Sequence, residues 1–582
     1  MYTFLIRVLL PLAVLILCRS VDAQARAVGY EVELSIDFAN GTIEGIETLA
    51  LRGGGEVDLG AAELTISEVM REGTALAFEQ SDGRVRFVVP ATEGETRVRL
   101  RYRGKPTRGL RIAAQQAFTA FHTNHWMVCD TDPAAKATLE LALIVPPGLT
   151  AVGCGKPTGQ DVLEDGRLRY RFSLERPHST YLFGFAVAAF TEATSRSGAV
   201  ALRFLGAPFS ADELQRIFRH TPTMLQFFEE RAGVPFPSEL YTQVLIPDGP
   251  PQEMAELTVM SERYGRSYLD DPREDFLIAH ELAHQWWGNL VTNRTWSDFW
   301  LHEGMVTFMV AAYKERFWGR DEYDREMGMA RQRYENALAK GEGRPLVHAN
   351  WKTAEEMSGP IAYSRGALVL HLLRRQLGER AFWNGIREFT RAHAGGSADS
   401  RDFRLALEKT SGQDLRTFFA QWVTGDAPAL FATHRMVKNG VEITIEQRQA
   451  SVWNFAVDIA VQTATERITR RVQIARRSQT FRFMVDEPVL SIVVDAKRDL
   501  PDPIVHERPV SMLLGQMLNE PEPSVRIGAM RAAEKTCSAA NAPAACSELP
   551  AALERVIAED AARLVRSVAT QTRERQIRHP ER

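Results

Sequence analysis

Two histidines and a glutamate stand close together in residues 279–289, which read AHELAHQWWGN. His280 and His284 are four positions apart, and Glu281 directly follows the first of them. Residues four apart in a helix lie on one face, about 6 Å from each other, so both imidazoles can reach one point. Neutral imidazole nitrogen is a preferred ligand of zinc, so the pair can hold one ion. Glu281 lies one step around the helix, where it can reach a water molecule on the metal but not easily the metal itself.

The pattern also has a purely structural explanation. Two histidines on an apolar helix face are usually packed core residues, and HExxH arises by chance in some chains. A third ligand decides between the explanations, because a catalytic zinc site has three protein ligands and one open position. Glu303, in the downstream sequence TWSDFWLHEG, is separated from His284 by 18 residues and can supply that ligand. The sequence therefore predicts a His2Glu site.

Two helices must position the three ligands. The first is predicted over residues 272–287, with Asp271 as its cap and a glycine at its end. The second is predicted to start at Thr295, where Asp298 completes a capping-box pattern, and to run to about Trp318. Orienting a zinc-bound histidine is the alternative role for Asp298, and the capping role is preferred.

The whole signature resembles that of a known family. HExxH, 18 residues and then a glutamate within WLHEG is similar to the motif of the gluzincin zinc aminopeptidases of the aminopeptidase N and leukotriene hydrolase type. Similarity continues in PHSTYLFGFAV (177–187), LQFFEERAGVPFP (225–237) and FFAQWVTGDAPAL (418–430). The resemblance covers roughly residues 30–500.

The resemblance implies a role for each catalytic group. It implies that His280, His284 and Glu303 hold one Zn²⁺ per chain, which activates water and polarises the scissile carbonyl. Glu281 would take the proton of the zinc-bound water and pass it to the leaving amine. A tyrosine in the family's Tyr-x-Lys-Gly pattern stabilises the oxyanion, and Tyr363 stands in that place in the sequence Tyr-Ser-Arg-Gly. Taken alone, this tyrosine would be interpreted as a packing residue.

The segment expected to bind a substrate amine departs from the family pattern. The family carries Gly-x-Met-Glu-Asn, whose glutamate pairs with the ammonium group, and Glu253 aligns with that glutamate in DGPPQEMAELT. Pro250 and Pro251 have no N–H to donate to a peptide laid along this strand. Ala117 and Thr119 occupy the places where a second amine-binding side chain is expected. The site for the substrate amine therefore has only one of its two expected groups, unless one of the two neighbouring glutamines supplies the second.

The rest of the chain predicts an α+β protein of several domains. Residues 24–200 alternate in short apolar and polar runs typical of strands, and residues 201–430 are mainly helical, beginning with one helix over 210–233. Residues 431–505 return to strands and predict a small β-sandwich, and residues 506–582 predict a short helical tail. The family resemblance implies that the first domain is saddle-like and the second thermolysin-like.

Composition narrows the range of partners. Of the 582 residues, 45% are hydrophobic and 25% are charged, as in ordinary globular proteins, and the formal net charge is −4. No run of lysines and arginines with interleaved aromatic residues stands out, so a nucleic-acid partner is not expected. Peptides are the expected substrates, and the oligomeric state does not follow from the sequence.

Residues 1–23 have the pattern of a secretory signal peptide. Arg7 precedes an apolar run of 11 residues, 8–18, and a cleavage site ends at Ala23. The run is shorter than the about 20 residues that cross a bilayer, so no stable membrane span is predicted after cleavage. The protein is therefore expected to be secreted or periplasmic. An uncleaved anchor and a lipid anchor at Cys18 are the alternatives.

Four cysteines remain after removal of the signal segment. An even number in an exported protein permits two disulfides. Cys537 and Cys546 are the favoured local pair, and Cys129 and Cys154 would then pair by default. Buried free thiols are the alternative.

Together these features predict an exported zinc metallopeptidase that hydrolyses peptide bonds and releases N-terminal residues. Two alternatives remain open. A peptidase with relaxed end-specificity would act on short or blocked peptides, because the amine site is incomplete. A zinc-bound binding protein would keep the scaffold without turnover, but the intact Glu281 and Tyr363 argue against it.

Overall fold

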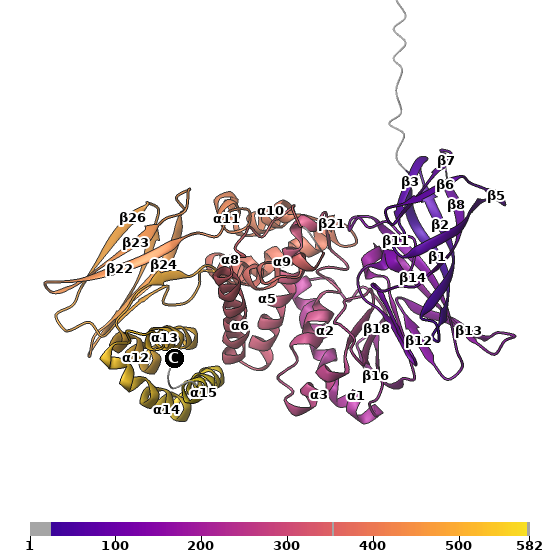
Figure 1. The fold of residues 1–582 in the computed structure, drawn as a ribbon. Helices are drawn as coiled ribbons and strands as arrows, with labels where there is room; N and C mark the ends of the chain where they lie inside the picture. The colour runs from indigo at the N-terminus through magenta and orange to yellow at the C-terminus, as the bar shows by residue number, and fades with distance from the viewer. Residues whose placement is uncertain (1–24, 93, 352–353, 579–582) are drawn as a thin grey trace, which may run out of the picture.

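The computed structural model describes residues 25–92, 94–351 and 354–578. The predicted signal segment, residues 1–23, lies outside these ranges. Figure 1 shows three parts along the molecule: β-sheets at one end, helices in the middle, and further β-sheets with a helical tail at the other end. This arrangement confirms the predicted α+β multidomain fold.

The N-terminal sheets follow from the alternation of apolar and polar residues. In β1 (Arg26–Asp37), Tyr30, Val32 and Leu34 are buried, while the side chains between them are more exposed. This strand pairs with one antiparallel and one parallel neighbour inside an eight-stranded sheet. Across the sheet the strands are β13 (Lys156–Val162), β14 (Leu168–Ser179), β11 (Lys136–Val145), β1, β2 (Thr42–Arg52), β8 (Glu95–Gly104), β4 (Leu64–Arg71) and β5 (Thr74–Ala75).

Two smaller sheets complete this end of the molecule. One brings the expected second amine-binding positions, in β10, towards the helical region. Its order is β12 (Thr150–Gly153), β15 (Phe185–Ala188), β10 (Gln116–Thr119) and β9 (Leu110–Ala113). The other consists of β3 (Gly55–Gly60), β7 (Arg84–Val89) and β6 (Phe78–Ser81).

The helical region begins on a four-stranded sheet of β16 (Thr191–Ser197), β17 (Val200–Gly206), β18 (Leu240–Ile246) and β19 (Leu257–Ser261). Residues 210–233 form two helices, α1 (Ala211–Ile217) and α2 (Thr221–Ala232), so the predicted single helix is wrong. The first helix ends at Ile217 and the second begins at Thr221, so that Pro222, which has no N–H to donate to a preceding turn, lies in the first turn of the second helix.

Several of the remaining helices pack against α5 (Trp300–Phe317), in which every residue from Trp300 to Lys314 is buried. A helix that is apolar all round belongs in the core, so α5 is a central support. In chain order these helices are α3 (Glu262–Asp270), α4 (Phe276–Ala283), α5 (Trp300–Phe317), α6 (Arg320–Ala339), α7 (Ala354–Met357), α8 (Gly366–Leu377), α9 (Glu379–His393), α10 (Ser400–Ser411) and α11 (Arg416–Trp422). Two short parallel strands pair beside these helices: β20 (Thr292–Asn293) precedes α5 in the chain, and β21 (Ser397–Ala398) precedes α10.

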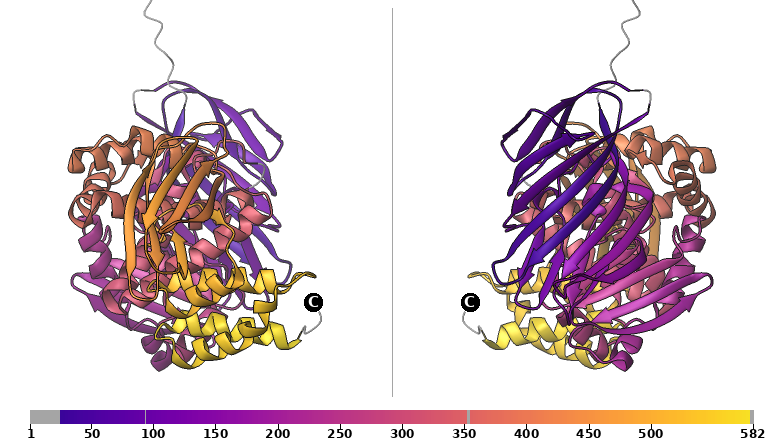
Figure 2. Two further views of the ribbon diagram at one scale, coloured as in Figure 1. Left: turned by 90° about the vertical axis from the view of Figure 1, so that its left-hand side faces the viewer. Right: turned by 90° about the vertical axis from the view of Figure 1, so that its right-hand side faces the viewer.

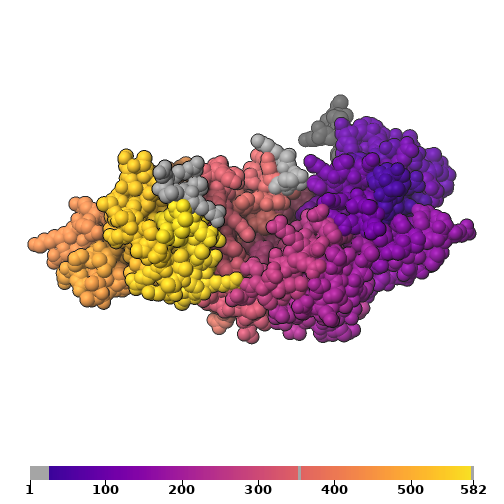
Figure 3. All heavy atoms as spheres, turned by 60° about the horizontal axis from the view of Figure 1, so that its bottom comes forward, coloured from indigo at the N-terminus to yellow at the C-terminus, as the bar shows by residue number. Residues whose placement is uncertain are grey.

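Two facing sheets and a helical tail form the C-terminal end, which faces the viewer in the left view of Figure 2. The sheets are β26 (Ser478–Met484), β23 (Gly440–Gln447), β22 (Leu430–Val437) and β28 (Ile504–His506), and then β25 (Arg467–Ile474), β24 (Phe455–Gln462) and β27 (Ser491–Val494). The tail is α12 (Val510–Asn519), α13 (Pro523–Cys537), α14 (Leu549–Glu559) and α15 (Arg563–Arg578). Figure 3 shows the tail lying beside the sandwich at this end.

The cysteines follow only half of the expected pairing. Cys537 and Cys546 are joined, whereas Cys129 and Cys154 are separate buried thiols, so the default second pair is wrong. The Cys154 thiol instead donates to the Leu182 carbonyl at 3.2 Å. Across residues 25–578, with the gaps given above, none of the helices is both long and apolar enough to cross a bilayer.

Candidate active site

The helix that carries the two histidines is shorter than predicted. It spans Phe276–Ala283 rather than residues 272–287. Asp271 does not cap it, because its carboxylate accepts from the Arg273 backbone N–H at 3.1 Å in a local turn after α3. The turn between the histidines is nevertheless helical, since the backbone N–H of His284 donates to the His280 carbonyl at 3.2 Å.

The helix that carries Glu303 also starts later than predicted. A 3-10 turn at Trp296–Asp298 precedes α5, and the Thr295 side chain makes no capping hydrogen bond. The Asp298 carboxylate accepts from the backbone N–H of Ser400 at 3.0 Å and from its hydroxyl. The predicted capping box is therefore wrong, and Asp298 ties the start of α5 to α10, about 100 positions downstream.

The three predicted ligands meet at one point. Nε2 of His280 lies 3.2 Å from a carboxylate oxygen of Glu303 and 3.3 Å from Nε2 of His284, which lies 3.4 Å from the same oxygen. Tetrahedral zinc with bonds of 2.0–2.1 Å has ligand atoms roughly 3.3–3.4 Å apart. The donor set and its spacing therefore fit a zinc ion without rearrangement.

Each ligand is held from behind. The three residues are between 1% and 5% exposed. Nδ1 of His284 lies 3.0 Å from the Trp287 carbonyl, which fixes the proton on Nδ1 and leaves the Nε2 lone pair for a metal. The ring of His280 lies between those of Phe276 and Tyr363, at centroid distances of 5.3 and 5.9 Å. Nδ1 of His280 has no hydrogen-bond partner among the described residues, so packing holds that side of the imidazole.

The charges in the cluster act on one another. Burial alone would lower the pKa of His284, but Glu303 and two further carboxylates raise it to about 10, so a metal that binds Nε2 would release a proton from it. Burial alone would raise the pKa of Glu303, but the two imidazoles lower it well below its usual range. Glu303 is therefore an anion, which is the state that a metal ligand requires.

Glu281 and Tyr363 belong to the same electrostatic group. Burial, followed by the charges of Glu253 and Glu303, raises the pKa of Glu281 well above that of a free carboxyl group. Burial and then the same carboxylates raise the pKa of Tyr363, so its hydroxyl keeps its proton at neutral pH. The tyrosine sits in η4 (Ile361–Arg365), a single π-helical turn, with its ring within 3° of parallel to that of His280.

Glu253 lies on the same site but is held by different means. One carboxylate oxygen accepts from the side-chain amide of Gln252 at 2.8 Å, and the other has no hydrogen-bond partner among the described residues. The side chain is 3% exposed, so the second oxygen is a buried acceptor with spare capacity. An ammonium group is the kind of ligand that would satisfy it.

Three amides near Glu253 were not predicted as site residues. The Asn289 side chain donates to the Glu253 carbonyl at 2.9 Å. The Gln285 side chain donates to the Met254 carbonyl and accepts from the backbone N–H of Glu256, both at 3.0 Å. Gln252 accepts from the Phe121 backbone N–H at 2.8 Å. Two of the three stand within the quoted motif, but only the folded chain shows which backbone groups they bind.

The second amine-binding side chain is missing in the structure too. Ala117 is fully buried, and the Thr119 hydroxyl is used within its own sheet, accepting from the Phe185 backbone N–H at 2.9 Å. The neighbouring Gln116 donates its amide to the Pro247 carbonyl at 3.3 Å. No acid or free amide therefore stands at these β10 positions.

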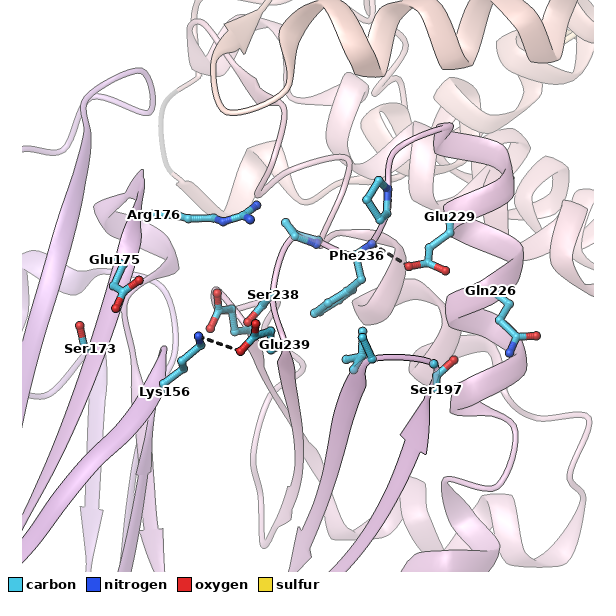
Figure 4. A pocket seen from close by; sticks show the side chains of 16 residues that line it. Lys156, Ser173, Glu175, Arg176, Ser197, Gln226, Glu229, Phe236, Ser238 and Glu239 are labelled. Carbon is cyan, nitrogen blue, oxygen red and sulfur yellow. Dashed lines mark hydrogen bonds and ion pairs between the residues drawn. The ribbon is translucent and has the colours of Figure 1, made fainter.

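Two cavities lie between the N-terminal sheets and the helices. An apolar one of about 500 Å3 lies near the cluster, where the Tyr181 hydroxyl is 3.5 Å from Nδ1 of His302. Its walls include Phe121, Tyr181, Trp296, Phe299 and Met357. A charged cavity of about 560 Å3 has Lys156 paired with Glu239 at 3.0 Å in its wall (Figure 4). None of the six predicted site residues lines either cavity, and only the apolar one borders the site, through Tyr181.

Comparison with known proteins agrees with this geometry. Residues 217–422 match the peptidase family M1 domain. This segment contains both helices of the metal cluster, Glu253 and Tyr363. Over this segment the chain is similar to peptidases of family M1.

The curated relatives of this chain are distant and longer. "Probable aminopeptidase 2" of Sulfurisphaera tokodaii is 26% identical over 447 residues, which are 72% of this chain and 56% of that protein. "Leucyl aminopeptidase" of Saccharolobus solfataricus is 23% identical over 497 residues, 81% of this chain and 62% of that protein. The chain thus spans somewhat more than half the length of these relatives.

A solved structure shows the same fold over most of the chain. The crystal structure of Legionella pneumophila aminopeptidase A in complex with aspartic acid superposes with a TM-score of 0.77 at 14% identity. The match covers 92% of this chain and 66% of that one. At this identity the likeness concerns the fold.

Proposed function

We propose that this chain is an exported zinc aminopeptidase that hydrolyses the first peptide bond of its substrates. The observation that carries the proposal is the triangle of ligand atoms from His280, His284 and Glu303, with sides of 3.2–3.4 Å. These sides match the edges of a tetrahedral zinc site, and two glutamates and a tyrosine surround it. The names of the curated relatives support the aminopeptidase assignment.

The roles of the chain's own groups follow from their chemistry. When bound, zinc would supply a Lewis acid that polarises the substrate carbonyl and acidifies water. Glu281, next to the metal ligand His280 in the chain, takes a proton from the attacking water and returns it to the leaving amine. Tyr363 keeps its hydroxyl proton and donates a hydrogen bond to the developing oxyanion.

Glu253 supports action at the N-terminus. Its unpartnered carboxylate oxygen is a buried acceptor beside the metal ligands, and a substrate ammonium would fill it. Anchoring the amine there would place the first peptide bond near the metal, so the chain would release single N-terminal residues.

A peptidase with relaxed end-specificity is the second candidate. The absence of a second amine-binding group at the β10 positions favours it, because the Thr119 hydroxyl is hydrogen-bonded within its own sheet. A single carboxylate discriminates less strongly against a blocked N-terminus than two groups do.

Metal analysis combined with two matched substrates tests these proposals. Purified chain is stripped with a chelator, reloaded with zinc, and assayed on a panel of aminoacyl anilides and their N-acetyl forms. The aminopeptidase proposal expects one zinc per chain, activity lost and restored with the metal, and a strong preference for the free amine. Equal cleavage of both forms would favour relaxed specificity. Full zinc loading without turnover on any substrate would favour a binding protein.

Export is part of the same proposal. The signal pattern of residues 1–23 and the Cys537–Cys546 disulfide both support an oxidising compartment. Cell fractionation with N-terminal sequencing of the mature protein tests it, and a mature chain beginning near residue 24 outside the cytoplasm is the expected result. An intact N-terminus on a cytoplasmic protein would contradict it.

A further inference from the structure

A buried cation lies directly behind the candidate catalytic tyrosine. Arg365 is two residues after Tyr363, in the same π-helical turn, and none of its surface is exposed. Its Nη2 lies 3.4 Å from a carboxylate oxygen of Asp502, which is 1% exposed. Because a desolvated charge is costly unless it is paired, Asp502 compensates the charge that this turn buries.

Asp502 comes from a distant part of the chain, the link between β27 and β28. Tyr334 of α6 donates its hydroxyl to the other carboxylate oxygen. Arg331, nearly one turn earlier on α6, donates to the carbonyls of Arg498 and Leu500 at 2.8 and 2.7 Å. The link is therefore fixed to α6 at several points, and α6 itself packs against η4.

The opposite side of the turn is fixed by a contact between glycines. Gly304 follows the metal ligand Glu303, and a Cβ at Gly304 would lie 2.8 Å from the Gly366 Cα and 2.9 Å from the Ala362 carbonyl oxygen. This approach leaves no room between α5 and the turn. The place of the tyrosine relative to the metal ligands is thus set by the glycine contact on one side and by the buried ion pair on the other.

We propose that Asp502 is a positioning residue for Tyr363: through Arg365 it holds the π-helical turn in the conformation that presents the tyrosine hydroxyl to the substrate. This inference rests on the proposed peptidase function. A single π-helical turn is an uncommon conformation that persists when its surroundings restrain it. Asp502 lies outside residues 217–422, so the C-terminal region completes a site whose reacting groups all stand in the M1 domain.

Replacing the carboxylate tests the proposal kinetically. Asp502→Asn preserves the shape of the side chain and removes its charge. We expect kcat to fall about tenfold to a hundredfold with KM within about twofold, because small misplacements of a catalytic group act on the transition state. Asp499→Asn is the matched control: Asp499 stands in the same link, is 4% exposed and pairs with Arg375 at 3.0 Å, away from the turn. Its kcat and zinc content should stay at the wild-type values.

A double-mutant cycle separates positioning from a general loss of stability. If Asp502 acts through the tyrosine hydroxyl, Asp502→Asn lowers kcat no further once Tyr363→Phe is present. Losses that multiply in the double variant would overturn the proposal. Tyr334→Phe, which removes one hydrogen bond to Asp502 and keeps the ion pair, takes the place of Asp502→Asn in the cycle if that variant does not fold. It should lower kcat by a smaller factor in the same way.

Hydrogen exchange gives a readout that does not need turnover. The amides of residues 361–366 should exchange at least about tenfold faster in Asp502→Asn than in Asp499→Asn. Unchanged exchange together with unchanged kcat overturns the positioning role and leaves the peptidase proposal standing. A wild-type chain that hydrolyses no substrate removes the peptidase proposal, and the exchange result then decides by itself whether Asp502 holds the turn.

Discussion

The metal side and the amine side of the candidate site are built in different ways. His280, His284 and Glu303 come from two helices that follow each other in the chain, and their ligand atoms meet within 3.2–3.4 Å. Glu253 stands on an irregular segment and depends on the amides of Gln252 and Asn289. Helical periodicity fixes the positions of the metal ligands, whereas contacts between separate segments of the chain fix the position of Glu253.

The metal side would carry out the hydrolysis, and the amine side would recognise the substrate. Apart from the arginine that replaces lysine after Tyr363, the departures from the family pattern that were found in the sequence lie on the amine side, at Pro250, Pro251, Ala117 and Thr119. The metal side keeps the whole signature. We therefore expect ordinary metallopeptidase chemistry with an altered dependence on the substrate amine. The ratio of free-amine to N-acetyl cleavage is the quantity that distinguishes the two sides.

The largest effect is expected from Glu281→Gln. The amide cannot accept the proton of the attacking water, so kcat should fall about 10²- to 10⁴-fold while zinc is retained. Free and blocked substrates should lose rate by the same factor, because the change lies on the metal side. Steady-state kinetics and elemental analysis measure both outcomes. Glu274→Gln, a more exposed change just before α4, is the control. Loss of zinc from the Glu281 variant would show that this carboxylate holds the metal.

Tyr363→Phe should have the next largest effect. Removing one donor to the oxyanion costs about 10²- to 10³-fold in kcat, with KM and zinc content nearly unchanged. The ratio of free to blocked cleavage should again stay constant. Tyr323→Phe, which removes a buried hydroxyl bonded to His371 at 2.6 Å, controls for loss of any buried hydroxyl. A variant that released its metal would contradict the oxyanion role.

The metal ligands could be predicted because their geometry needs little more than one helical turn. The predicted helix over residues 272–287 is too long, yet His280 in the shorter α4 and His284 at its C-terminal cap remain one helical turn apart. Errors at helix ends do not move an i, i+4 pair. Glu303 likewise keeps its place near the start of α5 although the helix begins after Thr295.

What could not be predicted depends on contacts between distant segments. Asp298 has a good capping pattern, but it binds Ser400, because the fold brings α10 to the start of α5. Gln285 binds backbone groups about 30 positions away, and no local pattern reveals such a partner. The fold class was predictable from the periodicity of each region. The break between α1 and α2 could also have been predicted, because Pro222 is a local signal for the start of a new helix.

Glu253→Gln should change recognition rather than chemistry. A charge-assisted hydrogen bond to an ammonium contributes about 1.5–3 kcal/mol, so KM for free-amine substrates should rise about tenfold to a hundredfold. Cleavage of N-acetyl substrates should change little, and the ratio should fall towards one. An unchanged ratio would mean that Glu253 does not bind the amine and would favour the relaxed peptidase.

Gln252→Met should have the smallest effect and is the sharpest test of how the amine side is built. It removes the hydrogen bond to the Glu253 carboxylate and leaves the Phe121 N–H without its acceptor. If the amide fixes the carboxylate for an incoming ammonium, KM rises about threefold to tenfold for free-amine substrates only. The double variant with Glu253→Gln should then be no worse than Glu253→Gln alone. Equal losses on free and blocked substrates would instead assign Gln252 to packing, and the two sides of the site would no longer differ in kind.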